Sequence, residues 1–380
     1  METNKKILIN AQWYDPALPT GVGNYFRRLA KKVFDLSMKE KLRFIIFHSG
    51  RSVFQDYKKL EEKKSVNVLD SSFRKLLWEN IKLPLYIFRN KPDIFYSINY
   101  SIPFILPENL RVVATVHDLI WFLFPRYFSN FTVRTAIWRM KRTVNRADLI
   151  ITNSENTKKD LIRYFRCSPT KIKVIYPGID LSRYQNINPE FAKRFLRKHN
   201  ITNPYFVWVG APRPTKNIEK LCESFIEANL GEVRLYIVGP AIFQFNYLKK
   251  RYQNEKKIVF LTNISDEELL VLYSNSIALV YPSLYEGFGL PVLEAMASNT
   301  LVITSGVSSL PEVGGKCAFY INPTKKESII KMMQIVRDLD EDTRKKILKK
   351  QYDYIKDNFD LGKQQEYFKN LLLYETREIY

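Results

Sequence analysis

Short apolar runs alternate along this chain with longer segments in which apolar residues recur every three or four positions. The short runs are rich in β-branched and aromatic residues, which favour strands, whereas the longer segments are typical of helices. The runs form two series, the first over residues 7–10, 43–47, 93–98, 111–116, 149–152 and 173–176, and the second over residues 205–209, 234–238, 258–261, 277–281, 301–304 and 318–321. Strands separated by helix-length segments indicate parallel sheets covered on both faces. The pattern therefore predicts an α/β chain with two doubly wound, Rossmann-like domains.

The division between the two series falls near residue 178. Tyr176-Pro177-Gly178 interrupts the pattern, and the polar stretch 180–204 that follows is expected to be a connector. Proline and glycine commonly mark such boundaries because they interrupt regular helices and strands. We therefore expect an N-terminal domain over residues 1–180 and a C-terminal domain over residues 200–362.

Cysteine usage and hydropathy limit where the protein can work. The 380 residues contain three cysteines and three histidines, all scattered along the sequence. An odd, scattered set of cysteines predicts no disulfide framework and is typical of a reducing compartment, and no Cys or His spacing suggests a metal site. The first residues lack the apolar core of a signal peptide, and no window approaches the roughly 18 apolar residues that cross a bilayer. We expect a cytoplasmic protein, either soluble or peripheral at the inner face of the cell membrane.

Positive charge is concentrated in the first half of the chain. Residues 1–200 contain 37 Lys and Arg against 17 Asp and Glu, whereas residues 201–380 contain 23 against 22. This asymmetry predicts an anionic partner for the first domain. Nucleic acid, a negatively charged membrane and a pyrophosphate-linked lipid all meet that description.

The basic segment 134–146 has an apolar helical face. That face is formed by Val133, Ile137, Met140 and Val144. A basic amphipathic helix can lie on an anionic membrane surface, and it can equally pack its apolar face into the core of its own domain. The sequence leaves both interpretations open.

The most informative stretch, residues 281–298, reads YPSLYEGFGLPVLEAMAS. It follows an expected strand, passes through a glycine-bearing loop with Glu286, and enters a helix near Pro291. The N–H groups and positive dipole end of such a helix start favour a phosphate, and Glu286, together with Glu294 in the expected first helical turn, adds carboxylates that accept hydrogen bonds from hydroxyls. A nucleotide sugar carries both groups. The same unit is common in α/β domains, so its spacing alone also permits a purely structural role.

Three further places follow expected strands at their carboxyl ends, where open α/β sheets bind ligands. Lys216 precedes a helix, which would place its ammonium group beside a diphosphate, and Arg213 lies in the same loop. His117 follows the fourth strand of the first series, and Gly21 and Gly23 open the helix after the first strand. Each place also has an ordinary structural interpretation, as a solvated basic loop, a buried hydrogen-bonding histidine and a common helix-opening turn.

These motifs resemble those of the retaining glycosyltransferases of family GT4, which have the two-domain GT-B fold. Residues 281–298 resemble the E-x7-E segment of that family and, with Ser308-Ser309-Leu310-Pro311-Glu312-Val313, resemble bacterial mannosyltransferases that extend O-antigen chains. The resemblance covers nearly the whole chain and is strongest over residues 205–325. It implies a donor held chiefly by the second domain, an acceptor on the first, and a final helix within residues 363–380 that crosses back to the first domain.

The resemblance also implies roles for individual residues. Glu286 would contact hydroxyls of the transferred sugar, Glu294 would contact those of the ribose, and His117 would contact the transferred sugar from the first domain. Lys216 would ease departure of the diphosphate, and Arg213 would replace an arginine that the family usually places elsewhere in this loop. The other implied donor-binding residues are Gly287, Phe288, Gly289, Leu290, Gly21 and Gly23. Since positive side chains take the place of a metal, neither a divalent ion nor a cofactor is expected.

We therefore expect a retaining hexosyltransferase that moves mannose from GDP-mannose to a glycan or lipid-linked glycan in cell-surface polysaccharide or lipopolysaccharide synthesis. UDP-glucose, UDP-galactose, UDP-GlcNAc and dTDP-rhamnose are the alternative donors. A sugar epimerase of the same fold is disfavoured because such enzymes usually lack the E-x7-E segment. A basic nucleic-acid-binding protein is the alternative from another class, but the chain contains no zinc, helix-turn-helix or RNP-type motif.

Overall fold

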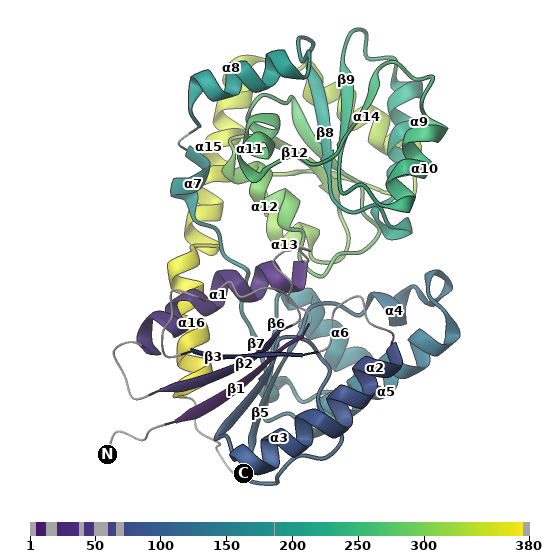
Figure 1. Cartoon of the computed structure of the whole chain (residues 1–380). Helices are drawn as coiled ribbons and strands as arrows, with labels where there is room; N and C mark the ends of the chain where they lie inside the picture. Colours follow the sequence, from purple (N-terminus) through teal and green to yellow (C-terminus); the bar gives the residue numbers. More distant parts are fainter. Residues whose placement is uncertain are drawn as a thin grey trace. The chain divides into compact units, whose positions relative to one another are not determined.

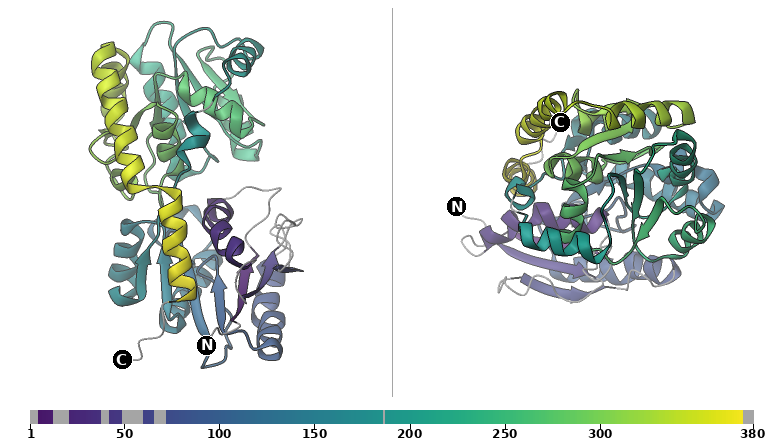
Figure 2. Two further views of the ribbon diagram at one scale, coloured as in Figure 1. Left: turned by 90° about the vertical axis from the view of Figure 1, so that its left-hand side faces the viewer. Right: turned by 90° about the horizontal axis from the view of Figure 1, so that it is seen from above.

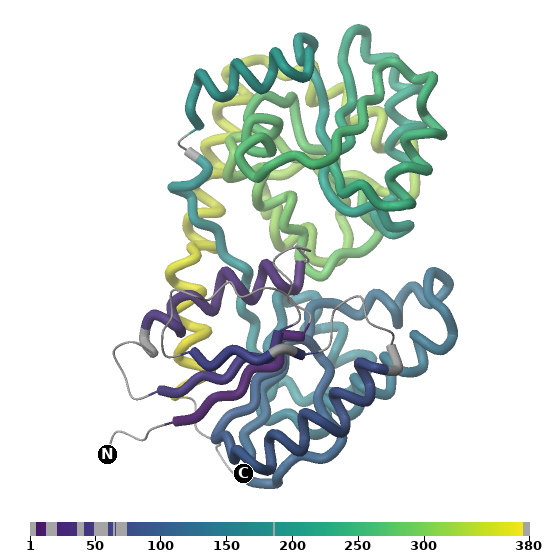
Figure 3. Tube along the Cα trace, viewed as in Figure 1, coloured from purple at the N-terminus to yellow at the C-terminus, as the bar shows by residue number. Residues whose placement is uncertain are grey.

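The computed structural model divides the chain into two compact units (Figure 1). It describes residues 5–12, 21–37, 42–48, 60–65, 72–185 and 187–374. Unit 1 comprises residues 1–178 and 361–380, and unit 2 comprises residues 179–360. Followed from purple to yellow in Figure 3, the chain first forms unit 1, then forms unit 2, and finally returns to unit 1.

The sheet of unit 1 is parallel throughout, with the described strands in the order β3-β2-β1-β4-β5-β6-β7. These strands are β1 (Lys6–Ala11), β2 (Arg43–His48), β3 (Leu60–Lys64), β4 (Ile94–Ser97), β5 (Arg111–Val116), β6 (Leu149–Thr152) and β7 (Ile172–Val174). Ile9 of β1 pairs with Ile46 of β2 on one side and with Tyr96 of β4 on the other. The strand order reverses between β1 and β4, and open α/β sheets bind ligands beyond the carboxyl ends of strands at such a reversal.

Helices cover both faces of this sheet. They are α1 (Gly21–Ser37), α2 (Ser72–Leu77), the π-helical turn η1 (Trp78–Lys82), α3 (Leu83–Asn90), α4 (Ile120–Leu123), the 3₁₀ turn η2 (Pro125–Tyr127), α5 (Asn130–Arg146), α6 (Glu155–Phe165), the 3₁₀ turn η3 (Pro169–Lys171) and α16 (Leu361–Leu373). Ile7 and Ile9 face a core that includes Phe26 of α1, whereas Leu8 faces a second core that includes Met140 of α5. Because successive residues of a strand point to opposite faces, a sheet buried on both sides needs near-continuous apolar runs.

The final helix, α16, packs against α1 within unit 1 (Figure 2). The side-chain amide of Gln365 donates a hydrogen bond to the carbonyl of Arg28 at 2.6 Å. The ring of Phe368 lies against that of Tyr96, with centroids 5.5 Å apart. The sequence predicts a helix from residue 363, whereas the structure begins it at Leu361, and residues 375–380 lie outside the described part of the chain.

Unit 2 contains a second parallel sheet, with the described strands in the order β10-β9-β8-β11-β12-β13. The strands are β8 (Tyr205–Val209), β9 (Arg234–Val238), β10 (Ile258–Leu261), β11 (Ala278–Tyr281), β12 (Leu301–Ser305) and β13 (Phe319–Ile321). The helical elements are α7 (Leu181–Gln185), α8 (Pro189–Lys198), the 3₁₀ turn η4 (Pro214–Lys216), α9 (Ile218–Ala228), α10 (Phe243–Arg251), α11 (Asp266–Ser274), α12 (Leu290–Ala297), α13 (Leu310–Gly314), α14 (Lys326–Arg337) and α15 (Glu341–Asn358). Two parallel sheets of this kind confirm the predicted fold class.

Two segments differ from the sequence prediction. The edge strand β3 was not expected, because its sequence, Leu-Glu-Glu-Lys-Lys, is charged; a strand with one neighbour can present such side chains to solvent. Residues 180–204, expected to be a connector, contain α7 and α8 and belong to unit 2. Asn188 caps α8, and Phe195 is buried, so a few apolar residues among many charges suffice to anchor this helix.

Helix α5 settles the two interpretations of the basic segment 134–146. Met140 and Val144 are buried in the second core of unit 1, and Ile137 packs against the same core. The apolar face read from the sequence is therefore a core face and cannot meet a membrane. None of the described helices is both long and apolar enough to span a bilayer.

Candidate functional site

Lys216 and Glu286, which lie far apart in the sequence, meet beyond the carboxyl ends of strands β8 and β11. The Lys216 Nζ atom lies 2.6 Å and 2.7 Å from the two carboxylate oxygens of Glu286. It also donates a hydrogen bond to the Tyr281 hydroxyl at 2.7 Å. The Lys216 and Glu286 side chains are 18% and 11% exposed, so solvent screens their attraction only partly. We call Lys216, Tyr281 and Glu286 the Lys–Glu cluster.

Backbone and side-chain hydrogen bonds join the loops that carry this cluster. The Leu284 N–H donates to the carbonyl of Thr215 at 2.7 Å, which joins the loop after β11 to the one after β8. The Asn217 side-chain amide donates to the carbonyls of Pro282 at 3.2 Å and Pro323 at 2.7 Å. Lys216 therefore approaches Glu286 because its backbone is held against the loop after β11.

Two serines at the start of α13 support the loop of Glu286. The Glu286 N–H donates to the Ser308 hydroxyl at 3.0 Å. The Ser309 hydroxyl lies 3.0 Å from the carbonyl of Glu286 and 2.8 Å from that of Phe288. Gly289 ends the loop with a φ of +109°, and a Cβ there would lie only 2.8 Å from the Leu310 side chain. The positive φ favours glycine at this position, and a Cβ would also force the Leu310 side chain to move.

Helix α12 begins at Leu290, directly after Gly289, with Pro291 in its first turn. The expectation that Glu294 lies in the first turn is wrong. Glu294 is the fifth helical residue and lies in the second turn, because the helix begins as soon as the positive-φ glycine has reversed the chain. Burial, and secondarily the charge of Glu294, raises the pKa of the Tyr273 hydroxyl.

The remaining predicted residues of unit 2 differ in what they present. Gly287 and Leu290 are partly buried in the same loop and helix start as Gly289. Phe288 is 4% exposed, and its ring packs edge-on against Phe359 with centroids 5.7 Å apart, so its side chain belongs to the core. Arg213 is exposed, and its carbonyl accepts a hydrogen bond from the Lys216 N–H at 2.8 Å.

In unit 1 the structure brings His117 together with the helix that Gly21 and Gly23 open. His117 follows β5, is 8% exposed, and its Nε2 lies 2.8 Å from the carbonyl of Ile98. Its ring stands edge-on to Tyr25 of α1, with centroids 5.1 Å apart. Gly23 is buried in the first turn of α1, whereas a Cβ at Gly21 would meet nothing within 4 Å. The described residues therefore give no packing reason for glycine at position 21.

Burial keeps the imidazole of His117 neutral at physiological pH. Desolvation lowers its pKa to about 4, although the hydrogen bond to Ile98 opposes this shift. A neutral ring that donates from Nε2 retains Nδ1 as an acceptor. His117 is therefore suited to accept a hydrogen bond from a hydroxyl rather than to act as a cation.

This pKa predicts a specific dependence of stability on pH. As pH falls from about 6.5 towards 4, the unfolded chain binds a proton that the buried imidazole refuses, so the free energy of unfolding falls. Replacing His117 by glutamine should remove about 2 kcal/mol of the loss between pH 7 and pH 5. Denaturant unfolding of both proteins at the two pH values measures this difference. An NMR titration in which the His117 ring protonates near pH 6.5 would contradict the prediction.

Sequence reasoning missed Tyr281, Asn217 and the supporting hydroxyl of Ser309. Tyr281 is the last residue of β11, so its position at the carboxyl end of a strand was the available signal. Asn217 adopts a φ of +57°, a conformation in which asparagine is enriched, directly before α9. The contacts that these side chains make depend on residues remote in sequence.

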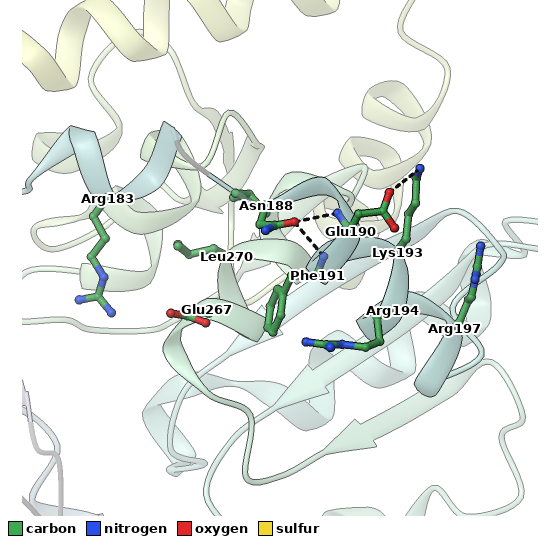
Figure 4. Close-up of a pocket in the computed structure, with 10 residues that line it drawn as sticks. Arg183, Asn188, Glu190, Phe191, Lys193, Arg194, Arg197, Glu267 and Leu270 are labelled. Atoms are coloured by element: carbon green, nitrogen blue, oxygen red, sulfur yellow. Dashed lines mark hydrogen bonds and ion pairs between the residues drawn. The ribbon is translucent and has the colours of Figure 1, made fainter.

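A concavity in unit 2 lies among α7, α8 and α11 and has a volume of about 740 Å³ (Figure 4). Basic side chains line much of it, including Arg183, Lys193, Arg194 and Arg197. None of the predicted site residues contributes to its lining. Among the described residues, no group of three or more His, Cys, Asp or Glu side chains could hold a metal ion.

Comparison with known proteins places this arrangement in a family. The family model "Glycosyltransferase Family 4" matches residues 19–183, and the model "Glycosyl transferases group 1" matches residues 191–353. The chain is 29% identical over 351 residues to O-antigen chain mannosyltransferase B of Escherichia coli, covering 86% of this chain and 89% of that protein. It is 31% identical over 245 residues to the O-antigen chain mannosyltransferase RfbU of Salmonella typhimurium, covering 63% and 64% of the two chains.

Solved structures show the same fold at lower sequence identity. A glycosyltransferase from Rickettsia africae superposes with a TM-score of 0.74 at 18% identity, over 98% of this chain and 99% of that one. Anabaena HepE, solved with UDP and glucose, superposes with a TM-score of 0.75 at 18% identity, over 97% and 99%. Since the two family models together span most of both units, the chain belongs to glycosyltransferase family 4 (GT4): it is a retaining glycosyltransferase of the GT-B fold, homologous to bacterial O-antigen mannosyltransferases, that transfers a sugar from a nucleotide sugar.

Proposed function

We propose that this enzyme transfers mannose from GDP-mannose to a hydroxyl of a glycan or lipid-linked glycan during the synthesis of a cell-surface polysaccharide. The choice of mannose rests on the O-antigen mannosyltransferases, one of which matches the chain over nearly its full length. The observation that carries the site is the Lys–Glu cluster, which lies beyond the carboxyl ends of two parallel strands and next to the start of α12. A diphosphate at that helix start would be stabilised by the positive end of the helix dipole.

Each residue of the cluster has a task in this proposal. In the free protein the three hydrogens of the Lys216 ammonium group face the two carboxylate oxygens of Glu286 and the Tyr281 hydroxyl. A phosphate oxygen would replace one of these acceptors, and Lys216 would stay bonded to Glu286 through one carboxylate oxygen. The Glu286 carboxylate orients hydroxyls of the transferred sugar, and Glu294 binds the ribose. Backbone N–H groups of Gly287, Phe288 and Gly289, with Leu290 and Arg213 beside them, complete the donor site. In unit 1, His117 accepts a hydrogen bond from the sugar, and Gly21 and Gly23 border the phosphates.

The reaction then proceeds by departure of the diphosphate. The bond between the anomeric carbon and the phosphate oxygen breaks, and negative charge grows on the leaving oxygens. Lys216 and the helix start would be held beside that charge by the surrounding loops, so stabilising it would require little reorganisation in the transition state. The acceptor hydroxyl attacks from the same face, its oxygen forms the new bond to the anomeric carbon, and its proton passes to the leaving phosphate. Configuration at that carbon is retained.

A panel of nucleotide sugars tests the choice of donor. GDP-mannose should raise the melting temperature of the enzyme, because a ligand that binds only the folded state stabilises that state. It should also be hydrolysed slowly when no acceptor is present. UDP-glucose, UDP-galactose, UDP-GlcNAc and dTDP-rhamnose should give smaller effects at equal concentration. A clear preference for one of these donors would overturn the assignment of mannose but leave the family unchanged. Tight, strongly salt-dependent DNA binding without any hydrolysis would overturn the proposed function itself.

A further inference from the structure

In unit 1, α2, η1 and α3 form a continuous helical segment. One side of this segment is buried against the sheet, and the exposed side is unusually apolar. Trp78, Leu83 and Ile87 are buried against the sheet. The exposed side chains over residues 74–90 are Arg74, Leu77, Ile81, Lys82, Leu85, Phe88 and Arg89. All seven are either apolar or cationic. The outer side of a surface helix in a globular protein is ordinarily polar, so an exposed stripe of large apolar residues needs an explanation.

The stripe is strongly exposed along its whole length. The exposed fractions are 40% for Leu77, 52% for Ile81, 58% for Leu85 and 46% for Phe88. Helix α5 shows the same combination of exposed apolar and basic residues. Its Phe131 and Trp138 are 65% and 41% exposed, and Arg134 and Lys141 on the same helix are also exposed. The loop before β5 contributes Phe104 and Ile105, which are 44% and 64% exposed.

Direct contacts join these three elements into one surface. The Phe104 N–H donates to the Asn80 side chain of η1 at 3.0 Å. The Phe104 ring meets that of Trp138 on α5, with centroids 4.2 Å apart. The guanidinium group of Arg142 lies 4.7 Å from the centre of the Phe104 ring. Figure 1 shows α2, α3 and α5 on the same side of the unit 1 sheet.

We call this the α3–α5 surface. It is defined by the exposed apolar residues Leu77, Ile81, Leu85, Phe88, Phe104, Ile105, Phe131 and Trp138 and the exposed basic residues Arg74, Lys82, Arg89, Arg134 and Lys141. The two helical segments, residues 72–90 and 130–146, contain only one acidic residue, Glu79. Glu79 is buried and lies 3.6 Å from Arg139, so the helices present no carboxylate to solvent.

A hollow on the same surface combines aromatic and basic walls. Phe104, Trp138, Lys141, Arg142 and Arg146 line it together with Asn145, and its volume is about 430 Å³. Arg142 and Arg146 are held in place by hydrogen bonds to the carbonyls of Pro103 and Leu110, respectively. Fixed guanidinium groups beside aromatic rings suit a phosphodiester headgroup next to apolar chains.

We propose that the α3–α5 surface is a membrane-docking face that seats unit 1 on a bilayer of anionic phospholipids. Its apolar side chains would enter the boundary between headgroups and acyl chains, and its basic side chains would meet the phosphates. Charge complementarity selects this occupant over a protein, because both helical segments expose cations without any carboxylate. A lipid-linked acceptor would be presented at such a surface, so the docking face extends the proposed function. Membrane docking rests on the proposed function only for the identity of the acceptor.

Vesicle binding by the full-length protein tests this face. The protein should float with vesicles of phosphatidylglycerol and phosphatidylcholine, should bind pure phosphatidylcholine vesicles far less, and should be released by salt. The double variants Ile81→Ser/Leu85→Ser and Lys82→Gln/Arg89→Gln should each lower the affinity for anionic vesicles by at least about tenfold. These residues are exposed, so their replacement should leave the fold intact.

Matched controls come from helix α10 of unit 2. Phe243 and Tyr247 are 82% and 51% exposed there, and Lys249 and Lys250 are exposed on the same helix. The variants Phe243→Ser/Tyr247→Ser and Lys249→Gln/Lys250→Gln should bind anionic vesicles as tightly as the unaltered protein. Equal losses in both pairs of variants would show nonspecific adsorption and overturn the proposal.

A second measurement reads the position of the surface directly. Brominated lipids should quench the tryptophan fluorescence of vesicle-bound protein, and Trp138→Phe should remove much of that quenching. Unaltered vesicle binding in the α3–α5 variants would overturn the proposal, as would a dimer in sedimentation velocity that only these variants abolish. Hydrolysis of GDP-mannose without vesicles is measured in parallel. Its absence would count against the proposed function and leave the docking face to be judged by vesicle binding alone.

Discussion

Replacing Glu286 by alanine is expected to lower kcat/KM for sugar transfer by at least about 100-fold, the scale of losing one preorganised group in an active site. The carboxylate is expected to orient the sugar, and in the free protein it holds the ammonium group of Lys216 at 2.6 Å. Its removal would therefore misplace both the transferred group and the cation that stabilises the leaving diphosphate. Steady-state kinetics with saturating acceptor measures the loss.

The same variant makes an opposite prediction for binding. Without Glu286, the charge of Lys216 is no longer neutralised within the cluster, so calorimetry should show an affinity for GDP that is retained or increased. Glu232→Ala is the matched control, because Glu232 is exposed in the loop before β9, at the amino end of the strands. Turnover within a few-fold of the unaltered enzyme in Glu286→Ala would mean that the site is misplaced.

Replacing Lys216 by methionine is expected to weaken GDP binding by about 10- to 100-fold, since a charge-assisted hydrogen bond to phosphate is among the stronger polar contacts. Methionine keeps most of the length of the side chain but removes the charge, so the change isolates electrostatics from packing. The Glu286 carboxylate would then lose its partner and repel the diphosphate. Calorimetry with GDP and thermal unfolding without ligand separate these effects.

Lys256→Met is the control for that experiment. Lys256 is exposed just before β10, at the end of the sheet opposite the Lys–Glu cluster. Lys256→Met should leave GDP affinity unchanged. That result would show that the loss of one positive charge at an arbitrary position does not weaken GDP binding. An unchanged affinity in Lys216→Met would reject the assignment of Lys216 to the diphosphate.

The strands that the sequence predicted best are those buried on both faces. β5, β6, β8 and β9, each of which has a neighbour on both sides, have the predicted ends. The edge strand β10 has them too, because its sequence, Ile-Val-Phe-Leu, is apolar throughout. Central parallel strands must be apolar on both sides, so their limits appear as abrupt changes in hydropathy. Strand β3 lacks that signal because an edge strand needs only one neighbour, and α8 lacks it because few of its residues are buried.

The local geometry of the site could be predicted in outline. The glycine loop, the helix after it and the positions of Lys216 and His117 at the ends of strands follow from residue order alone. The helical turn occupied by Glu294 did not, because it depends on where Gly289 reverses the chain: the helix begins at Leu290, one residue before the expected Pro291, which moves Glu294 from the fourth helical position to the fifth.

The α3–α5 surface shows a similar limit. Apolar residues occur almost all around residues 76–88, so the sequence could not say which of them are buried. Packing against the sheet selects Trp78, Leu83 and Ile87 for the core and leaves Leu77 and Leu85 exposed. Conversely, the apolar face of α5 that the sequence allowed to lie on a membrane is buried in the core of unit 1.

By itself, the order of residues determined two parallel α/β sheets and a strand–loop–helix unit after β11, because hydropathy and glycine placement act over a few neighbouring positions. Only the tertiary structure decided that Lys216 bonds to Glu286 and Tyr281, that His117 is neutral against Ile98, and that α16 lies on α1. These contacts join residues between 19 and 337 positions apart, and their energies arise from burial and distance, which exist only once the sheets have assembled.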